Sequence, residues 1–133
     1  MALTAVDTNV VVRLLTRDDE VQFRHAERCF SDGDVFLPDS VLLETAWVLA
    51  SAYSFDEAQI AMALRHLLGL PNVRVAAPAR IFATLQWYER GLDFADALHL
   101  AASQQASRLH TFDRNFIRDA AGLGACPVVD AAQ

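Results

Sequence analysis

The chain has 133 residues, of which 53% are hydrophobic and 21% are charged, and its formal net charge is −6. This length and composition fit one folded domain and exclude a disordered chain. All eleven basic residues are arginine, and the absence of lysine excludes P-loop nucleotide hydrolysis and Schiff-base chemistry. No apolar run approaches the roughly 18 residues of a membrane span, and the first residues do not resemble a secretory signal. We therefore expect a cytoplasmic protein without a membrane segment.

Short apolar strands alternate with amphipathic helices along the whole sequence. In chain order, we predict a strand at 3–6, helices at 8–16 and 19–30, a strand at 35–38, helices at 39–53 and from about 55 to 68, a strand at 73–76, helices at 78–90 and 93–107, a strand at 108–112, a helix at 114–120 and a strand at 127–130. Such alternation indicates right-handed βαβ units and a parallel sheet. The predicted fold is one α/β domain over residues 1–133, a three-layer α/β/α sandwich with a short central parallel sheet.

Three acidic residues occupy related places in this pattern. Asp7 follows the first predicted strand, and Asp113 follows the strand at 108–112. Asp96 lies in the first turn of the helix at 93–107. Because ligands bind beyond the carboxyl ends of the strands in open α/β sheets, we expect the three carboxylates at one edge of the sheet.

A fourth acidic residue, Glu44, lies inside the predicted helix at 39–53. Its neighbours three and four positions away include Val41, Trp47 and Val48, so it is predicted to lie on an apolar face. A carboxylate in such a place is costly unless something pairs with it. Trp47 itself is predicted to be a core residue or a dimer contact.

Carboxylates that converge without cations repel one another, and their pKa values rise. Divalent ions would remove the conflict, and oxygen ligands favour Mg²⁺ or Mn²⁺. Two such ions about 4 Å apart would activate a water and stabilise the leaving oxygen of a phosphodiester. Two Mg²⁺ ions add four positive charges and change the formal charge from −6 to −2, which eases the approach of an RNA backbone.

Each acidic residue also has a purely structural interpretation. Asp7 and Asp113 each fit the N-cap of the helix that follows them. Asp93 fits an N-cap with Asp96 in the first turn, where the helix dipole favours a negative charge. Glu44 alternatively faces solvent or pairs with an arginine.

The acidic residues belong to four short motifs that occur in a fixed order. These motifs are Asp7-Thr8-Asn9, Glu44, the segment Asp93-Phe94-Ala95-Asp96-Ala97-Leu98-His99, and Thr111-Phe112-Asp113. They resemble the ordered motifs of PIN-domain proteins over nearly the whole chain. The length and the continuation Arg13-Leu14-Leu15 resemble the VapC-type toxins of bacterial toxin–antitoxin pairs in particular.

The resemblance implies a Mg²⁺- or Mn²⁺-dependent endoribonuclease whose metal ligands and catalytic residues are Asp7, Glu44, Asp96 and Asp113. It also implies an RNA substrate, a homodimer, and a cognate antitoxin with a segment that blocks the acidic groove.

Supporting roles follow from the same resemblance. Thr8 and Asn9 are expected to order the first loop, and Thr111 to orient a water or Asp113. Asn115 stands where some relatives carry a further acidic residue, so the sequence leaves open whether one or two metal ions bind.

Two arginines lie close in sequence to these carboxylates. Arg13 follows Asp7, and Arg114 follows Asp113 directly. Because a guanidinium matches the geometry of phosphate, we predict that Arg13 and Arg114 contact RNA.

Two other classes of function compete with the nuclease. A metal-dependent phosphatase or phosphotransferase with an aspartyl nucleophile usually needs a D-x-D motif and a lysine, and this chain has Asp7-Thr8-Asn9 and no lysine. The alternative that remains is a catalytically silent PIN-like module that only binds RNA or a protein.

Overall fold

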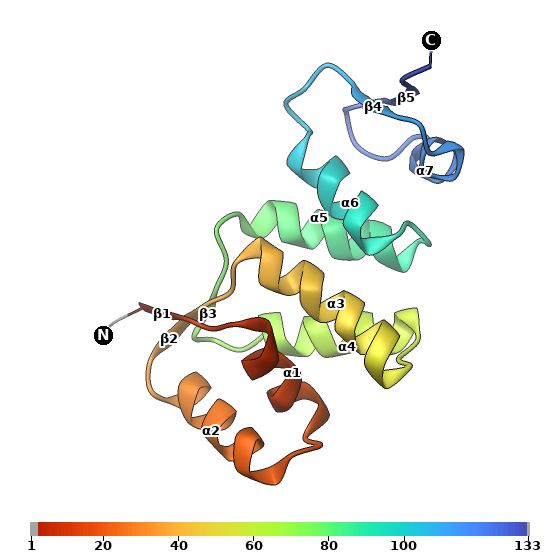
Figure 1. Cartoon of the computed structure of the whole chain (residues 1–133). Coiled ribbons are helices and arrows are strands. Elements are labelled where there is room, and N and C mark those ends of the chain that lie inside the picture. The colour runs from red at the N-terminus through yellow and green to blue at the C-terminus, as the bar shows by residue number, and fades with distance from the viewer. Residues whose placement is uncertain (1–2, 133) are drawn as a thin grey trace. The chain divides into compact units, whose positions relative to one another are not determined.

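The computed structural model of the chain describes residues 3–132. The chain divides into two compact units, residues 1–76 and 77–133, and each is described by itself. Within the described residues, seven helices and five short strands alternate along the sequence (Figure 1).

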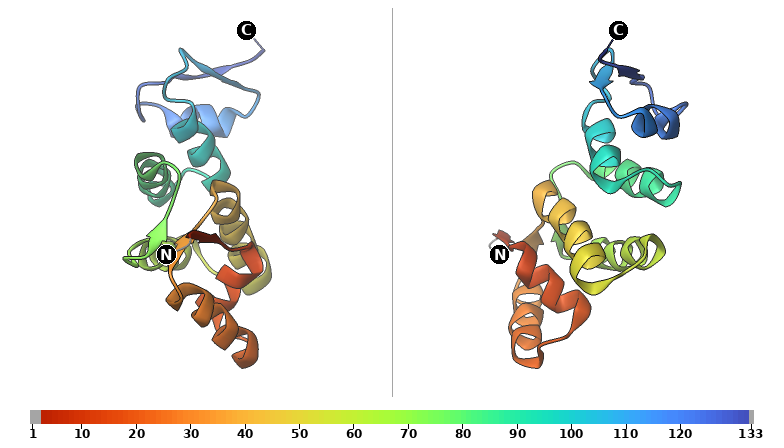
Figure 2. Two further views of the ribbon diagram at one scale, coloured as in Figure 1. Left: turned by 90° about the vertical axis from the view of Figure 1, so that its left-hand side faces the viewer. Right: turned by 45° about the vertical axis from the view of Figure 1, so that its right-hand side comes forward.

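The first unit contains a three-stranded parallel sheet in the order β1-β2-β3. Its strands are β1 (Leu3–Ala5), β2 (Asp34–Phe36) and β3 (Val73–Arg74), and its helices are α1 (Thr8–Thr16), α2 (Glu20–Ser31), α3 (Asp39–Tyr53) and α4 (Glu57–Leu68). The register places Thr4 opposite Val35, and Val35 opposite Val73. Helix α1 contacts both α2 and α3, and α3 contacts α4 (Figures 1 and 2).

Local chemistry fixes where these helices begin. The Asp19 carboxylate accepts a hydrogen bond from the backbone N–H of Gln22 at 3.0 Å and so caps α2. Asp56 and Gln59 form a complete capping box at the start of α4.

The apolar faces of the helices cover the strands of the first unit. Fully buried members of this core are Val11, Val35, Leu37, Leu42, Leu49, Ile60, Leu64 and Leu67.

The second unit contains a pair of parallel strands and three helices. The elements are α5 (Pro78–Glu89), α6 (Phe94–Ala102), β4 (Leu109–Thr111), α7 (Arg114–Ala120) and β5 (Val128–Asp130). Strand β4 pairs with β5 so that Leu109 lies opposite Val128, and α7 makes the crossover between them. Helix α5 packs along α6. One core cluster of this unit consists of Leu92, Ala97, Leu100, Phe116, Ala120 and Cys126.

The predicted α/β class with short parallel strands is confirmed, and every predicted element occurs within a few residues of its expected place. The largest difference is the helix expected at 93–107, which ends at Ala102. Gln104 explains this early end. Its amide donates to the carbonyl of Leu100 at 2.9 Å, and its side-chain oxygen accepts from the N–H of Ala125 at 2.7 Å. The side chain thus satisfies a terminal helix carbonyl and ties down a distant loop.

None of the helices in residues 3–132 combines the length and the apolar character needed to cross a membrane.

Candidate active site

Asp7 lies at the junction between β1 and α1. Its extended backbone (φ −84°, ψ 166°) makes it the N-cap of α1, and its Oδ1 atom accepts from the N–H of Thr8 at 2.7 Å. The cap interpretation of Asp7 is therefore confirmed. The side chain is nevertheless exposed, so its capping bond does not prevent it from meeting a ligand.

Thr8 connects this junction to α3. Its side chain is buried, and its hydroxyl donates a hydrogen bond to Oε1 of Glu44. Helices α1 and α3 follow the parallel neighbours β1 and β2, so both helices begin at the carboxyl edge of the sheet. Asp7 and Glu44 consequently share the lining of one hollow of about 360 Å³. The other lining residues are Thr8, Asn9, Val12, Arg13, Val48, Ala52 and Tyr53.

The surroundings of Glu44 differ from the prediction. The buried stripe of α3 runs through Leu42, Thr45 and Leu49, which are spaced three and four residues apart. Glu44 and Trp47 lie outside this stripe, and Trp47 is 68% exposed. The prediction that Glu44 is on an apolar, buried face is wrong, and so is the core interpretation of Trp47. Glu44 is linked to the Asp7 junction by its bond to Thr8 and by the hollow that it lines with Asp7.

In the second unit, Asp93 and Asp113 each cap a helix. Asp93 accepts from the N–H of Asp96 at 3.2 Å at the start of α6. Asp113 accepts from the N–H groups of Asn115 at 2.9 Å and Phe116 at 3.2 Å at the start of α7. Both cap interpretations are confirmed.

Asp96, in the first turn of α6, has a carboxyl group whose pKa is raised by its surroundings. Partial burial raises the pKa of its carboxyl above the ordinary value of 3.8, and the negative charges of Asp93 and Asp113 raise it further, whereas His99 opposes the shift. Asp113 thus acts on Asp96 through its charge, as Asp93 does. A bound cation would relieve this repulsion.

The supporting residues lie beside the carboxylates. The hydroxyl of Thr111 accepts from the N–H of Asp113 at 3.0 Å and so fixes the turn between β4 and α7. Asn9 is exposed and lines the hollow with Asp7. Asn115 follows Asp113 in the first turn of α7, and its side chain is exposed.

The four predicted carboxylates fall into two pairs by unit: Asp7 and Glu44 line one hollow of the first unit, and in the second unit Asp113 acts on Asp96 through its charge. Residues 3–132 contain no group of three or more His, Cys, Asp or Glu side chains placed to hold a metal ion. A single centre built from all four carboxylates remains a prediction.

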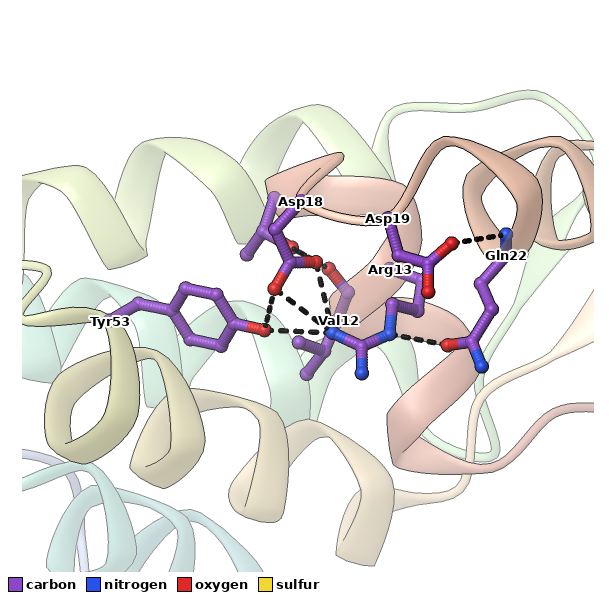
Figure 3. Close-up of polar contacts among 7 residues, drawn as sticks. Val12, Arg13, Asp18, Asp19, Gln22 and Tyr53 are labelled. Atoms are coloured by element: carbon purple, nitrogen blue, oxygen red, sulfur yellow. Dashed lines mark hydrogen bonds and ion pairs between the residues drawn. The ribbon is translucent and has the colours of Figure 1, made fainter.

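The two predicted RNA-contact residues differ in their surroundings. Arg13 lines the hollow and is bonded to Asp18 and Tyr53 (Figure 3). Arg114 is exposed and makes no ion pair among the described residues. Sequence reasoning missed Asp18 and Tyr53. Asp18 lies five residues from Arg13, but Tyr53 is forty residues away, and no local pattern signals that contact.

Comparison with known proteins identifies the family. Residues 4–122 match the PIN domain family. The chain belongs to the PIN-domain family. The match extends over parts of both units, and its range includes the four predicted carboxylates.

No curated protein matches the chain. A similar solved structure is VapC20 of Mycobacterium tuberculosis, described as a toxin that cleaves the sarcin–ricin loop. Its sequence is 21% identical, and the alignment covers 93% of this chain and 98% of that chain with a TM-score of 0.43.

Proposed function

We propose that this PIN-domain protein is a metal-dependent endoribonuclease that acts as the toxin of a toxin–antitoxin pair. The observation that carries the proposal is that the four carboxylates fall into two pairs, one in each unit of the chain. Asp7 and Glu44 line the same hollow, and the charge of Asp113 acts on Asp96. The proposed ligand set for Mg²⁺ or Mn²⁺ consists of these four residues, within one domain formed by both units.

The chemistry of the donors fits such an ion. All four are carboxylates, which hard divalent cations prefer, and the chain has no lysine to neutralise them. The pKa of Asp96 is raised first by partial burial and then by the charges of Asp93 and Asp113, and a bound cation would offset the charge repulsion. When bound, Mg²⁺ would supply a water of lowered pKa and charge stabilisation for the leaving oxygen of the phosphodiester.

The protein's own residues supply order around these carboxylates. The buried Thr8 hydroxyl fixes one oxygen of Glu44, and Thr111 fixes the backbone of Asp113. Because Asn115 brings no negative charge, the proposal leaves the number of ions at one or two. Arg13 and Arg114 are the proposed contacts to RNA phosphates.

The proposed partners are RNA, a cognate antitoxin and a second copy of this chain, in the cytoplasm. The resemblance of the motifs to VapC-type toxins supports these partners. The exposed indole of Trp47 supports a protein partner too, because a large aromatic side chain at the surface is typical of an interface.

The test is cleavage of RNA by the purified protein with Mg²⁺ or Mn²⁺, and its arrest by a chelator. An Asp7→Asn variant purified in the same way is the control for contaminating nucleases. Undiminished cleavage in excess chelator would contradict the metal-dependent mechanism. RNA binding without cleavage in any metal would favour the catalytically silent module. Sequencing of the 5′ ends of the fragments would identify the RNA.

A further inference from the structure

The side chain of Arg13 is held by contacts from three directions (Figure 3). Its Nη1 atom donates to Oδ1 and Oδ2 of Asp18 at 2.9 and 3.0 Å and to the hydroxyl oxygen of Tyr53 at 3.0 Å. Its Nε atom donates to the side-chain oxygen of Gln22 at 2.5 Å. The partners belong to the loop between α1 and α2, to the end of α3, and to α2, so the guanidinium cannot turn freely.

The partners of Arg13 are themselves fixed. The Tyr53 hydroxyl donates to Oδ2 of Asp18 at 2.7 Å, and the Thr16 hydroxyl donates to Oδ1 at 3.0 Å. These hydrogen bonds favour the ionised carboxylate and lower the pKa of Asp18, with the bond from Tyr53 contributing most. Asp18 therefore stays negatively charged near neutral pH, and its ion pair with Arg13 is maintained.

One nitrogen of the Arg13 guanidinium takes no part in this hydrogen-bond network. Within residues 3–132, Nη2 of Arg13 makes no hydrogen bond or ion pair, and Figure 3 shows no dashed line to it. Its two N–H groups would form charge-assisted hydrogen bonds with an anion. A guanidinium that is already fixed by hydrogen bonds also loses less conformational entropy when it binds an anion.

Arg13 also lies between two hollows of the first unit. Together with Asn9, it lines the hollow that holds Asp7 and Glu44 and also a second one of about 210 Å³. The second hollow is completed by Val10, Gln22, His25, Ala26 and Cys29. A chain that occupies both hollows would lie against Arg13 and Asn9, the two residues that the hollows share.

We propose that Arg13 binds, through Nη2, a phosphate of single-stranded RNA beside the phosphate that is cleaved, and that Asp18 and Tyr53 are positioning residues for it. The proposal rests on the proposed ribonuclease function. It assigns Arg13 to substrate binding, so its loss should raise KM and leave kcat nearly unchanged.

The test is the initial rate of cleavage of a labelled single-stranded RNA pool in Mg²⁺, measured at several salt concentrations. We expect Arg13→Ala to raise KM by about 10- to 100-fold, the range for a charged hydrogen bond. The slope of log(kcat/KM) against log salt should become shallower by about 0.7, the value for one phosphate contact on a single strand. Tyr53→Phe removes no charge and should raise KM by about 3- to 10-fold with the slope unchanged.

Arg17→Ala is the matched control. Arg17 is an arginine one turn further along, 62% exposed and paired with Glu20, and it lines neither hollow. Its removal should change KM and the salt slope little. An Arg13→Ala variant with wild-type KM, or with the same salt slope as wild type, would overturn the proposal. If Arg13→Ala does not fold, Arg13→Lys is measured in its place. A KM within twofold of wild type in both Arg13→Lys and Tyr53→Phe would also overturn the proposal. Absence of cleavage by the wild-type protein would instead contradict the proposed function.

Discussion

The hydrogen bond between Thr8 and Glu44 joins two residues that are 36 positions apart in the sequence. The bond uses one oxygen of the Glu44 carboxylate, and a glutamine amide oxygen at the same place would accept it equally well. A Glu44→Gln substitution therefore separates the charge of this residue from its structural contact.

We expect Glu44→Gln to reduce the rate of RNA cleavage by at least about 100-fold, on the order of 3 kcal/mol, because a charged contact to the reacting centre is lost. The melting temperature without metal should change little, since the bond from Thr8 is retained. Cleavage kinetics and thermal unfolding in chelator measure the two effects. Thr8→Ser, which keeps the hydroxyl, is the control and should remain active. Near-normal cleavage by Glu44→Gln, alongside an inactive Asp7→Asn, would exclude Glu44 from the site.

At the level of the element, the first turn of α6 combines two opposing effects on one carboxylate. The amino end of a helix favours a negative charge. Burial of Asp96, together with the charges of Asp93 and Asp113, acts in the opposite direction and raises its pKa. The helix itself does not need this charge, because Asp93 supplies the cap through the backbone N–H of Asp96.

Asp96→Asn should therefore stabilise the metal-free protein at neutral pH. A carboxyl whose pKa is higher in the folded state costs nothing below its unfolded pKa, near 3.8. Its cost grows as the pH rises through the folded pKa. The free energy of unfolding of Asp96→Asn, measured with urea in chelator, should thus exceed that of wild type at pH 7, and the difference should vanish near pH 4.

Asp119→Asn is the control of opposite sign in the same unit. The hydrogen bond from Arg118 lowers the pKa of Asp119, so its contribution to stability is present at neutral pH and disappears as the pH falls through the folded pKa. This substitution should destabilise slightly at pH 7. If Asp96→Asn also loses stability at pH 7, the charge of Asp96 supports the fold, and the metal assignment loses its electrostatic argument.

At the level of the whole molecule, the two carboxylate pairs belong to different compact units, and the PIN-domain match includes both pairs. If all four residues bind the same metal centre, an ion that binds only the folded protein raises its stability by an amount set by its concentration and affinity. Loss of a ligand from either unit must then remove most of that effect.

We expect Mg²⁺ or Mn²⁺ to raise the melting temperature of the wild-type protein, and Asp7→Asn and Asp96→Asn each to abolish most of the rise. Asparagine caps a helix as well as aspartate does, so α1 should keep its cap in Asp7→Asn. Thermal unfolding across a metal titration is the measurement. Glu20→Gln, which removes an exposed carboxylate of the first unit, serves as the control. Full metal stabilisation in Asp7→Asn but not in Asp96→Asn would show that the two pairs do not share a centre.

Much of this protein was predictable from the sequence because the determining interactions are local. Caps by Asp7, Asp93 and Asp113 involve neighbours within three residues, and short-range chemistry of this kind sets helix starts. The alternation of apolar strands and helices predicted the α/β class in the same way. The order of the acidic motifs pointed to the PIN-domain family, which the match over residues 4–122 confirms.

Contacts between distant residues could not be predicted in this way. Sequence periodicity gave Glu44 a buried apolar face, but the packing of α3 through Leu42 and Leu49 leaves it at an exposed hollow. The hydrogen bond from Arg13 to Tyr53 depends on how α1 packs against α3. Such contacts arise when the apolar faces of whole helices pack, so only the tertiary structure determines which polar side chains meet at the edges of those faces.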